Sequence, residues 1–207
     1  VTTEDACAAS CAFGTGYRAI ATRGRVQPGE VVVILGAGGV GLHTIQIARV
    51  AGAHVLAVDS DERKLEVAKQ LGAAGAALAG DDAQDMVRDY TSGRGADVVI
   101  DIVGHKETLE QATQMLRRAG RVVGLGYVAG GYSRLPMDEF VLREREFIGS
   151  RYAHRNEMER VLSLMADGRL KAIVDDVLPL EEANVALERL ERGEVVGRTI
   201  LRHAEPS

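Results

Sequence analysis

A glycine-rich turn at residues 36–41, with the sequence GAGGVG, is the feature that most restricts how this chain can fold. It directly follows the apolar run EVVVIL and opens a stretch in which Val40, Thr44 and Ile47 fall on one helical face. The next apolar run, HVLAVD, ends in an acidic residue. A strand, a G-x-G-x-x-G turn, a helix and a second strand in this order predict a parallel βαβ unit.

The glycines of this turn have distinct steric roles. Gly36 permits the tight turn, Gly38 lets the backbone approach a pyrophosphate, and Gly41 lets the helix pack closely on the strand. Gly39 and Val40 complete the loop. Its free N–H groups and the positive end of the following helix are suited to holding phosphate groups. The sequence therefore predicts a dinucleotide site in preference to a glycine turn without a ligand.

The acidic residue at the end of the second strand is Asp59. A carboxylate there would accept hydrogen bonds from the adenosine ribose hydroxyls and repel the 2′-phosphate of NADP. We therefore expect NAD to be the preferred cofactor. Lys64, one turn into the next helix, could reach the same ribose, and an ordinary solvated lysine is the equally open alternative.

Strand-like and helix-like stretches alternate along residues 28–168, which we interpret as a dinucleotide-binding domain. Strands are expected at residues 30–35, 54–59, 75–80, 96–103, 120–126 and 146–150. Helices are expected at residues 40–51, 61–71, 82–90, 106–118 and 156–166. The runs at 30–35, 54–59 and 96–103 are interpreted as apolar strands buried on both faces, and the run at 75–80 as a weaker, short strand. The pattern predicts an α/β fold, an open doubly wound parallel sheet of six strands in the order 3-2-1-4-5-6.

Two flanking segments do not follow this alternation. Residues 1–27 are expected to form a helical lead-in, with Thr2 or Thr3 followed by acidic residues as its N-terminal signal. Residues 169–207 are expected to be extended at first, then helical at 181–192, and to end in a strand at 198–201. We interpret both as connections toward a separate catalytic domain.

Composition excludes several classes of partner. The net charge is -5, with no run of lysine or arginine, so nucleic acid is not an expected partner. No apolar stretch reaches membrane-spanning length, and no signal peptide is expected from the first residues given. Cys7 and Cys11 are too few and too close for a secreted disulfide framework, which favours the cytoplasm. The chain begins with Val1 instead of methionine, as expected for a piece of a longer protein.

Six segments spread over nearly the whole chain carry a family resemblance: SCAFGTGYRAI, VVVILGAGGVGLHTIQIARVAGA, VDSDERKLEVAKQLGA, ADVVIDIVG, GRVVGLG and VVGRTIL. In this order they resemble the cofactor-binding half of the medium-chain, zinc-dependent alcohol dehydrogenases. The resemblance implies that Cys11 is the third protein ligand of a catalytic zinc and that Thr15 lies beside the nicotinamide. It also implies that Val40 packs behind the nicotinamide ring and that Arg198 reaches back to the pyrophosphate.

The same resemblance implies further cofactor contacts at the ends of later strands. His105 falls on the adenine side of the family's site, and Val103 is expected to contact the cofactor. Leu125 and Tyr127 fall in its wall on the nicotinamide side, together with residues 149–151. These roles rest on the family pattern alone.

The chain departs from the family in lacking its zinc machinery. This sequence lacks the other zinc ligands of the family, a cysteine and a Gly-His-Glu pair. It also lacks the family's four-cysteine structural zinc loop. The other histidines match no ligand position and are interpreted as packing or surface residues: His43, His54, His154 and His203. Cys7 is expected to be buried packing. Zinc is therefore expected only in the full-length enzyme.

The sequence thus predicts the NAD(H)-binding domain of a zinc-type alcohol dehydrogenase that transfers hydride between an alcohol or aldehyde and nicotinamide. One alternative is the cofactor domain of a zinc-free quinone or enoyl reductase, which Cys11 and Asp59 disfavour. Another is a stand-alone nucleotide-binding module. The resemblance also implies a homo-oligomer joined through the sheet edge at residues 140–150, where Phe147 and Ile148 form an apolar edge.

Overall fold

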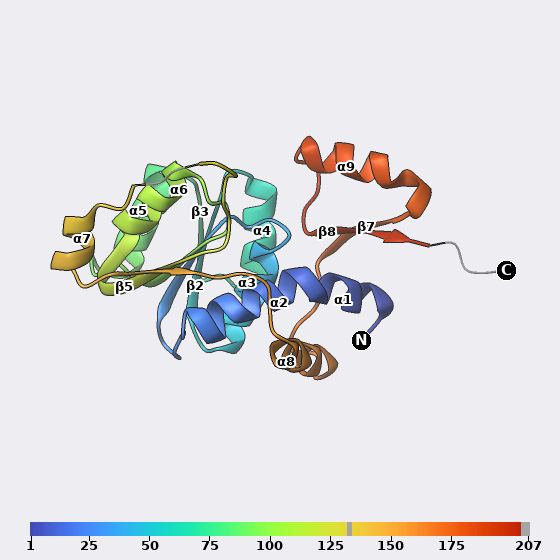
Figure 1. Cartoon of the computed structure of the whole chain (residues 1–207), viewed down its shortest axis with the longest axis horizontal. Coiled ribbons are helices and arrows are strands. Elements are labelled where there is room, and N and C mark those ends of the chain that lie inside the picture. Colours follow the sequence, from blue (N-terminus) through green and yellow to red (C-terminus); the bar gives the residue numbers. More distant parts are fainter. Residues whose placement is uncertain (132–133, 204–207) are drawn as a thin grey trace.

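The computed structural model describes residues 1–131 and 134–203, and its main body is an open parallel sheet (Figure 1). The six strands are β1 (Val31–Leu35), β2 (His54–Asp59), β3 (Gly75–Leu78), β4 (Ala96–Asp101), β5 (Leu116–Gly124) and β6 (Glu146–Gly149). Their order is β3-β2-β1-β4-β5-β6, and every neighbouring pair runs parallel. The predicted doubly wound fold and its strand order are confirmed.

The helices that accompany the sheet are α3 (Gly41–Val50), α4 (Glu62–Gln70), α5 (Asp81–Tyr90), α6 (Lys106–Met115), α7 (Met137–Leu142) and α8 (Arg155–Ala166). Asp61 caps α4 through its side chain, which accepts a hydrogen bond from the Arg63 N–H. The short helix α7 has no counterpart among the sequence predictions.

The core consists of two layers, one on each face of the sheet. Alternate residues of each strand point to opposite faces, so Val32 and Ile34 join one layer while Val33 and Leu35 join the other. The first layer contains α3, α4 and α8, and the second contains α5 and α6. All residues of β1 and β4 are buried, as expected for strands covered on both faces, and in β4 these include Asp97 and Asp101.

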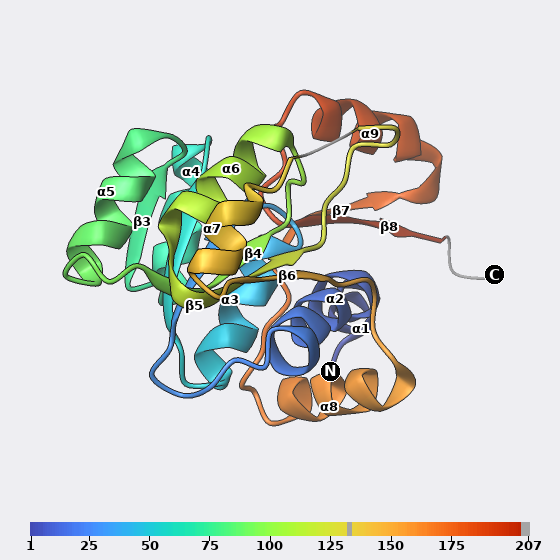
Figure 2. The same cartoon turned by 60° about the vertical axis from the view of Figure 1, so that its left-hand side comes forward.

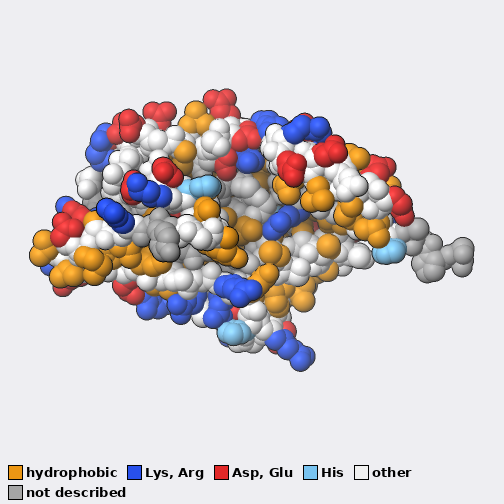
Figure 3. All heavy atoms as spheres, turned by 45° about the horizontal axis from the view of Figure 1, so that its top comes forward, with side chains coloured by type: hydrophobic (Ala, Val, Ile, Leu, Met, Phe, Trp, Pro, Cys, Tyr) orange, Lys and Arg blue, Asp and Glu red, His pale blue; other side chains and the backbone are white. Residues whose placement is uncertain are grey.

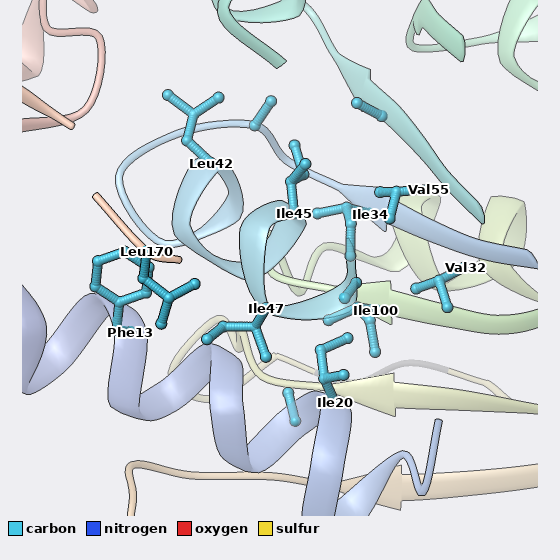
Figure 4. Close-up of a cluster of buried hydrophobic side chains, with 14 of the residues drawn as sticks. Phe13, Ile20, Val32, Ile34, Leu42, Ile45, Ile47, Val55, Ile100 and Leu170 are labelled. Atoms are coloured by element: carbon cyan, nitrogen blue, oxygen red, sulfur yellow. The ribbon is translucent and has the colours of Figure 1, made fainter. Parts of the chain in front are cut away.

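The helical lead-in is present over residues 3–23 as α1 (Thr3–Ala8), η1 (Ala9–Phe13), α2 (Gly14–Tyr17) and η2 (Arg18–Arg23). Thr2 is its N-cap and forms a capping box with Asp5. Figure 4 shows Phe13 and Ile20 of the lead-in pointing toward the apolar face of α3, which in turn covers β1. Helix α8 packs beside the lead-in (Figure 2), held by an ion pair from Arg18 to the buried Glu157.

We call residues 169–207 the return segment, of which residues 204–207 lie outside the described part. It contains β7 (Val174–Pro179), η3 (Leu180–Glu182), α9 (Ala183–Glu191) and β8 (Arg198–Arg202). β7 and β8 pair in parallel as a separate two-stranded sheet. Figure 1 shows α9 and this small sheet to one side of the six-stranded sheet.

Several predicted boundaries were wrong, including those of two helices. The helix expected at 106–118 ends at Met115, because Leu116 already pairs with Ala96 at the start of β5. Ala119 has φ of 53°, a left-handed conformation that cannot continue a helix. The helix expected at 181–192 begins with the 3-10 turn η3 and ends at Glu191.

None of the helices in residues 1–131 and 134–203 combines the length and the apolar character needed to cross a membrane.

Candidate dinucleotide site

The glycine turn between β1 and α3 requires glycine at two positions. Gly36 has φ of 97° and donates its N–H to the Val58 carbonyl at 2.8 Å. A Cβ atom on Gly41 would lie 1.8 Å from the Gly36 carbonyl oxygen, so any side chain there would separate helix from loop. A Cβ atom on Gly38 would meet nothing within 4 Å. Gly38 therefore borders open space at the N-terminus of α3, where the helix has no side-chain cap.

The carboxylate of Asp59 is fixed beside this turn. It accepts hydrogen bonds from the Ala37 N–H at 2.7 Å and the Asp61 N–H at 3.0 Å. Lys64 Nζ lies 3.7 Å from Asp59 Oδ1, and the Asp59 side chain is only 9% exposed. The backbone donors orient the carboxylate, and its remaining lone pairs are free to accept from a hydroxyl group.

A cavity of about 230 Å³ opens beside Asp59. It is lined by Leu35, Gly36, Val58, Asp59, Ser60, Ala79, Val103, Thr108 and Gln111. Sequence reasoning named Gly36, Asp59 and Val103 from this set and missed Thr108 and Gln111 of α6. No local pattern marks those two residues, which reach the cavity because α6 follows β4, the neighbour of β1.

Arg198, at the start of β8, lies against the glycine turn at Gly39. A Cβ atom on Gly39 would lie 2.9 Å from Arg198 Nε and 2.6 Å from the Gly197 carbonyl oxygen. The return segment therefore brings a guanidinium to the loop that α3 follows. A positive side chain, free N–H groups and the positive end of a helix meet there, which is the electrostatic environment of an anion site.

His43 was interpreted from sequence as a packing or surface histidine, and the structure gives it a more specific place. It is fully buried, its Nδ1 lies 2.7 Å from the Gly39 carbonyl oxygen, and its Nε2 lies 3.0 Å from the Ile173 nitrogen. Phe13 packs edge-on against the ring with centroids 4.5 Å apart. Burial lowers the pKa of His43 to about 4, so the ring is neutral at physiological pH.

Cys11 and Thr15 lie on the lead-in. Cys11 is exposed, Thr15 is half-buried, and the adjacent Gly16 packs closely against Thr44 of α3. Within the described ranges, no three His, Cys, Asp or Glu side chains gather as a metal-binding group. Cys7 is exposed, so the prediction that it is buried packing was wrong.

His105 and Tyr127 do not line the Asp59 cavity. They border a separate cavity of about 390 Å³ between the N-terminus of α6 and the ends of β5 and β6. His105 is the N-cap of α6, and Tyr127 is 83% exposed. Leu125 is half-buried and donates its N–H to the Asp101 carbonyl at 2.8 Å.

Asp101 holds the turn after β4, and sequence reasoning did not single it out. Its carboxylate accepts from the N–H groups of Val103 at 3.1 Å and Gly104 at 3.0 Å and from the Thr108 hydroxyl at 3.0 Å. Burial nevertheless raises the pKa of the Asp101 carboxyl above its usual value. This turn places Val103 against Gly36.

The chain is similar to a known protein family and to several curated proteins. The family described as zinc-binding dehydrogenase matches residues 39–167. An NAD-dependent alcohol dehydrogenase of Sulfolobus acidocaldarius is 36% identical over 207 residues, covering 98% of this chain and 58% of that protein. An acryloyl-coenzyme A reductase of Metallosphaera sedula is 30% identical over 200 residues, covering 96% of this chain and 58% of that protein.

Among solved structures, the alcohol dehydrogenase of Aeropyrum pernix superposes with a TM-score of 0.89 at 35% identity, over 97% of this chain and 59% of that one. The chain thus spans less than two thirds of the length of each of these relatives.

Proposed function

The chain belongs to the family of zinc-binding dehydrogenases, and we propose that it binds NAD(H) and presents the nicotinamide for hydride transfer. In the full-length enzyme the hydride would pass between the cofactor and a small alcohol or aldehyde. The relative from Sulfolobus acidocaldarius, named as an NAD-dependent alcohol dehydrogenase, supports this assignment.

One observation carries the proposal: three groups suited to one dinucleotide converge on the glycine turn that precedes α3. Open space faces Gly38, the oriented carboxylate of Asp59 lines the neighbouring cavity, and Arg198 lies against Gly39. The residues therefore fit a dinucleotide, with the pyrophosphate at Gly38 and Gly39 and the adenosine ribose at Asp59.

Each residue of this chain would have a binding or orienting role, since the bound nicotinamide itself supplies the hydride chemistry. Arg198 would neutralise the pyrophosphate, and Lys64 would hold Asp59 and reach the ribose. We propose that Val40 and Thr15 flank the nicotinamide, with Leu125 and Tyr127 forming its far wall. Val103 would contact the adenine side, and His105 would lie farther out.

Zinc is not supported by the described residues alone. Cys11 is an exposed thiol, and the part of the chain that the structure describes gathers no group of three or more metal-ligating side chains. A catalytic zinc needs three protein ligands. We propose that Cys11 serves as a zinc ligand only when the full-length enzyme supplies the others.

The runner-up function is that of a zinc-free quinone or enoyl reductase. The similarity to an acryloyl-coenzyme A reductase favours it to a lesser degree, because that relative is 30% identical against 36% for the alcohol dehydrogenase. Asp59 and Cys11 are the residues that separate the two functions. A stand-alone nucleotide-binding module would keep the cofactor site and have no zinc at any length of the protein.

The deciding experiment is a calorimetric titration of the 207-residue chain with NADH and with NADPH. Because Asp59 would face the 2′-phosphate of NADPH, we expect NADH to bind about 30- to 1000-fold more tightly. Asp59→Ser should narrow this gap mainly by weakening NADH. Equal or tighter binding of NADPH by the unaltered chain would contradict the assignment.

We also propose that copies of this chain associate through the edge of the sheet at β6, in the cytoplasm. β6 is an edge strand, and exposed apolar side chains gather there and on α7: Met137, Val141, Leu142 and Phe147. Figure 3 shows hydrophobic side chains at the surface around this end of the molecule. An open apolar edge favours pairing with a second copy. Light scattering at tens of micromolar should therefore give at least a dimer mass.

A further inference from the structure

A closed ring of contacts connects the glycine turn to Arg198. The Gly39 carbonyl contacts Nδ1 of His43, and Nε2 of His43 contacts the Ile173 nitrogen. The Ile173 carbonyl accepts the N–H of Arg198 at 2.9 Å. The Arg198 side chain then returns to Gly39, where a Cβ atom would lie 2.9 Å from its Nε. Four residues from three separate parts of the chain thus fix one another.

These contacts assign one tautomer to the imidazole of His43. A carbonyl oxygen only accepts and a backbone N–H only donates, so Nδ1 must carry the proton and Nε2 must be bare. Both nitrogens of this fully buried ring are therefore used by the protein. An imidazole protonated on both nitrogens would face the Ile173 N–H with a second donor. The hydrogen bond between His43 and Ile173 would then be lost.

We propose that His43 is a positioning residue for the pyrophosphate site, because it holds the return segment so that Arg198 lies over the glycine turn. This inference rests on the proposed function, since the benefit of placing Arg198 is measured by cofactor binding. His43 itself is buried beneath the loop and is not expected to touch the cofactor. Its effect passes through Ile173 to the backbone of Arg198.

The surroundings of His43 favour this role over simple packing. Phe13 from the lead-in contributes an uncharged edge, and Gln46, one turn further along α3, makes two more hydrogen bonds to the return segment at Lys171. The charged group that faces the ring among the described residues is Arg198 itself. Burial and this nearby guanidinium together keep the ring neutral.

Two substitutions separate the two hydrogen bonds of the ring. In His43→Asn, the short amide reaches about as far as Nδ1, so it retains a donor for Gly39 and loses Ile173. In His43→Gln, the longer amide reaches about as far as Nε2, so it retains an acceptor for Ile173 and loses Gly39. If Arg198 is placed through Ile173, the asparagine variant should be the weaker binder.

The experiment is a double-mutant cycle on NADH affinity in the 207-residue chain. We expect His43→Asn to weaken NADH about tenfold and His43→Gln about threefold, the range of one lost buried hydrogen bond. In the Arg198→Ala background both substitutions should change the affinity less than twofold. Circular dichroism confirms that each variant is folded.

The possible outcomes are distinct. If the unaltered chain fails to bind NADH, the proposed function falls and this inference with it. If the chain binds NADH but the effects of His43 and Arg198 substitutions are additive, or His43→Asn binds as well as the unaltered chain, only the inference is overturned. If neither His43 variant folds, His43 is a determinant of the fold and its positioning role is rejected.

Discussion

The six-stranded sheet and the return segment are held in place by different physical means. In the sheet, β1 and β4 are buried throughout and apolar layers cover both faces. In the return segment, α9 has no buried residue, and over residues 169–203 few apolar side chains are buried: Leu170, Ala172, Val195 and Ile200. Its position instead depends on directional contacts to Ile173 and Lys171.

This difference indicates that apolar burial stabilises the sheet, whereas hydrogen bonds position the return segment. Burial of apolar surface is large and non-directional, so it stabilises the sheet without aiming any one side chain. Hydrogen bonds are individually modest but geometrically exacting. The side chain that must be aimed, Arg198, lies on the part of the chain that hydrogen bonds hold. The following predictions test whether the stability of the fold and the placement of Arg198 can be changed separately.

The largest expected effect is on the free energy of unfolding, and a matched pair of leucine-to-alanine substitutions measures it. Leu56 on β2 is fully buried, whereas Leu187 on α9 is 57% exposed. Leu56→Ala should reduce the free energy of unfolding by about 2–5 kcal/mol, through lost burial and the cavity left behind. Leu187→Ala should change it by less than about 0.5 kcal/mol. Urea denaturation followed by circular dichroism gives both values, and similar losses for the two variants would remove the contrast between the regions.

The second prediction concerns acid. The pKa of His43 is about 4 in the folded chain against an ordinary value of 6.5. Between these pH values the unfolded chain binds a proton that the folded chain does not, so stability falls as pH falls. The contribution of His43 is complete above pH 6.5 and is lost progressively toward pH 4, by about 3 kcal/mol in all.

The matched control for this prediction is His43→Gln, which has no titratable group at this position. Urea denaturation at pH 7.5 and 4.5 should show a larger loss of stability for the unaltered chain than for the variant. Other titrating groups contribute to both proteins and cancel in the comparison. Parallel losses in the two proteins would mean that His43 is not buried in its neutral form.

Much of the sheet could be predicted from sequence, because its determinants are local. The apolar run VVVIL is itself the buried strand β1, and the spacing of Gly36, Gly38 and Gly41 follows from the geometry of one turn. The errors arose where a non-local contact decides the structure. Leu116 begins a strand because it pairs with Ala96. The helical pattern of the residues before Leu116 gives no sign of this pairing.

The candidate site was predicted in the same uneven way. Asp59 and Arg198 could be named, the first from its spacing after the glycine turn and the second from the family pattern. His43 could not, because its role depends on Ile173, 130 positions along the chain. Thr108 and Gln111 were missed for the same reason, since only the sheet order brings α6 to the Asp59 cavity.

The smallest expected effect isolates one contact between the two regions. Gln46 is buried on α3, and its side-chain amide donates to the Lys171 carbonyl and accepts the Lys171 N–H, both at 2.9 Å. Gln46→Ala should lower the free energy of unfolding by about 1 kcal/mol, since water can replace part of both bonds at the exposed Lys171. The same substitution at Gln84, whose amide contacts Gln114 at 2.8 Å in an exposed position, is the matched control and should have no measurable effect. Because His43 still holds Ile173 in Gln46→Ala, NADH affinity should fall less than in His43→Asn. A greater fall would move the main support of Arg198 from His43 to Gln46.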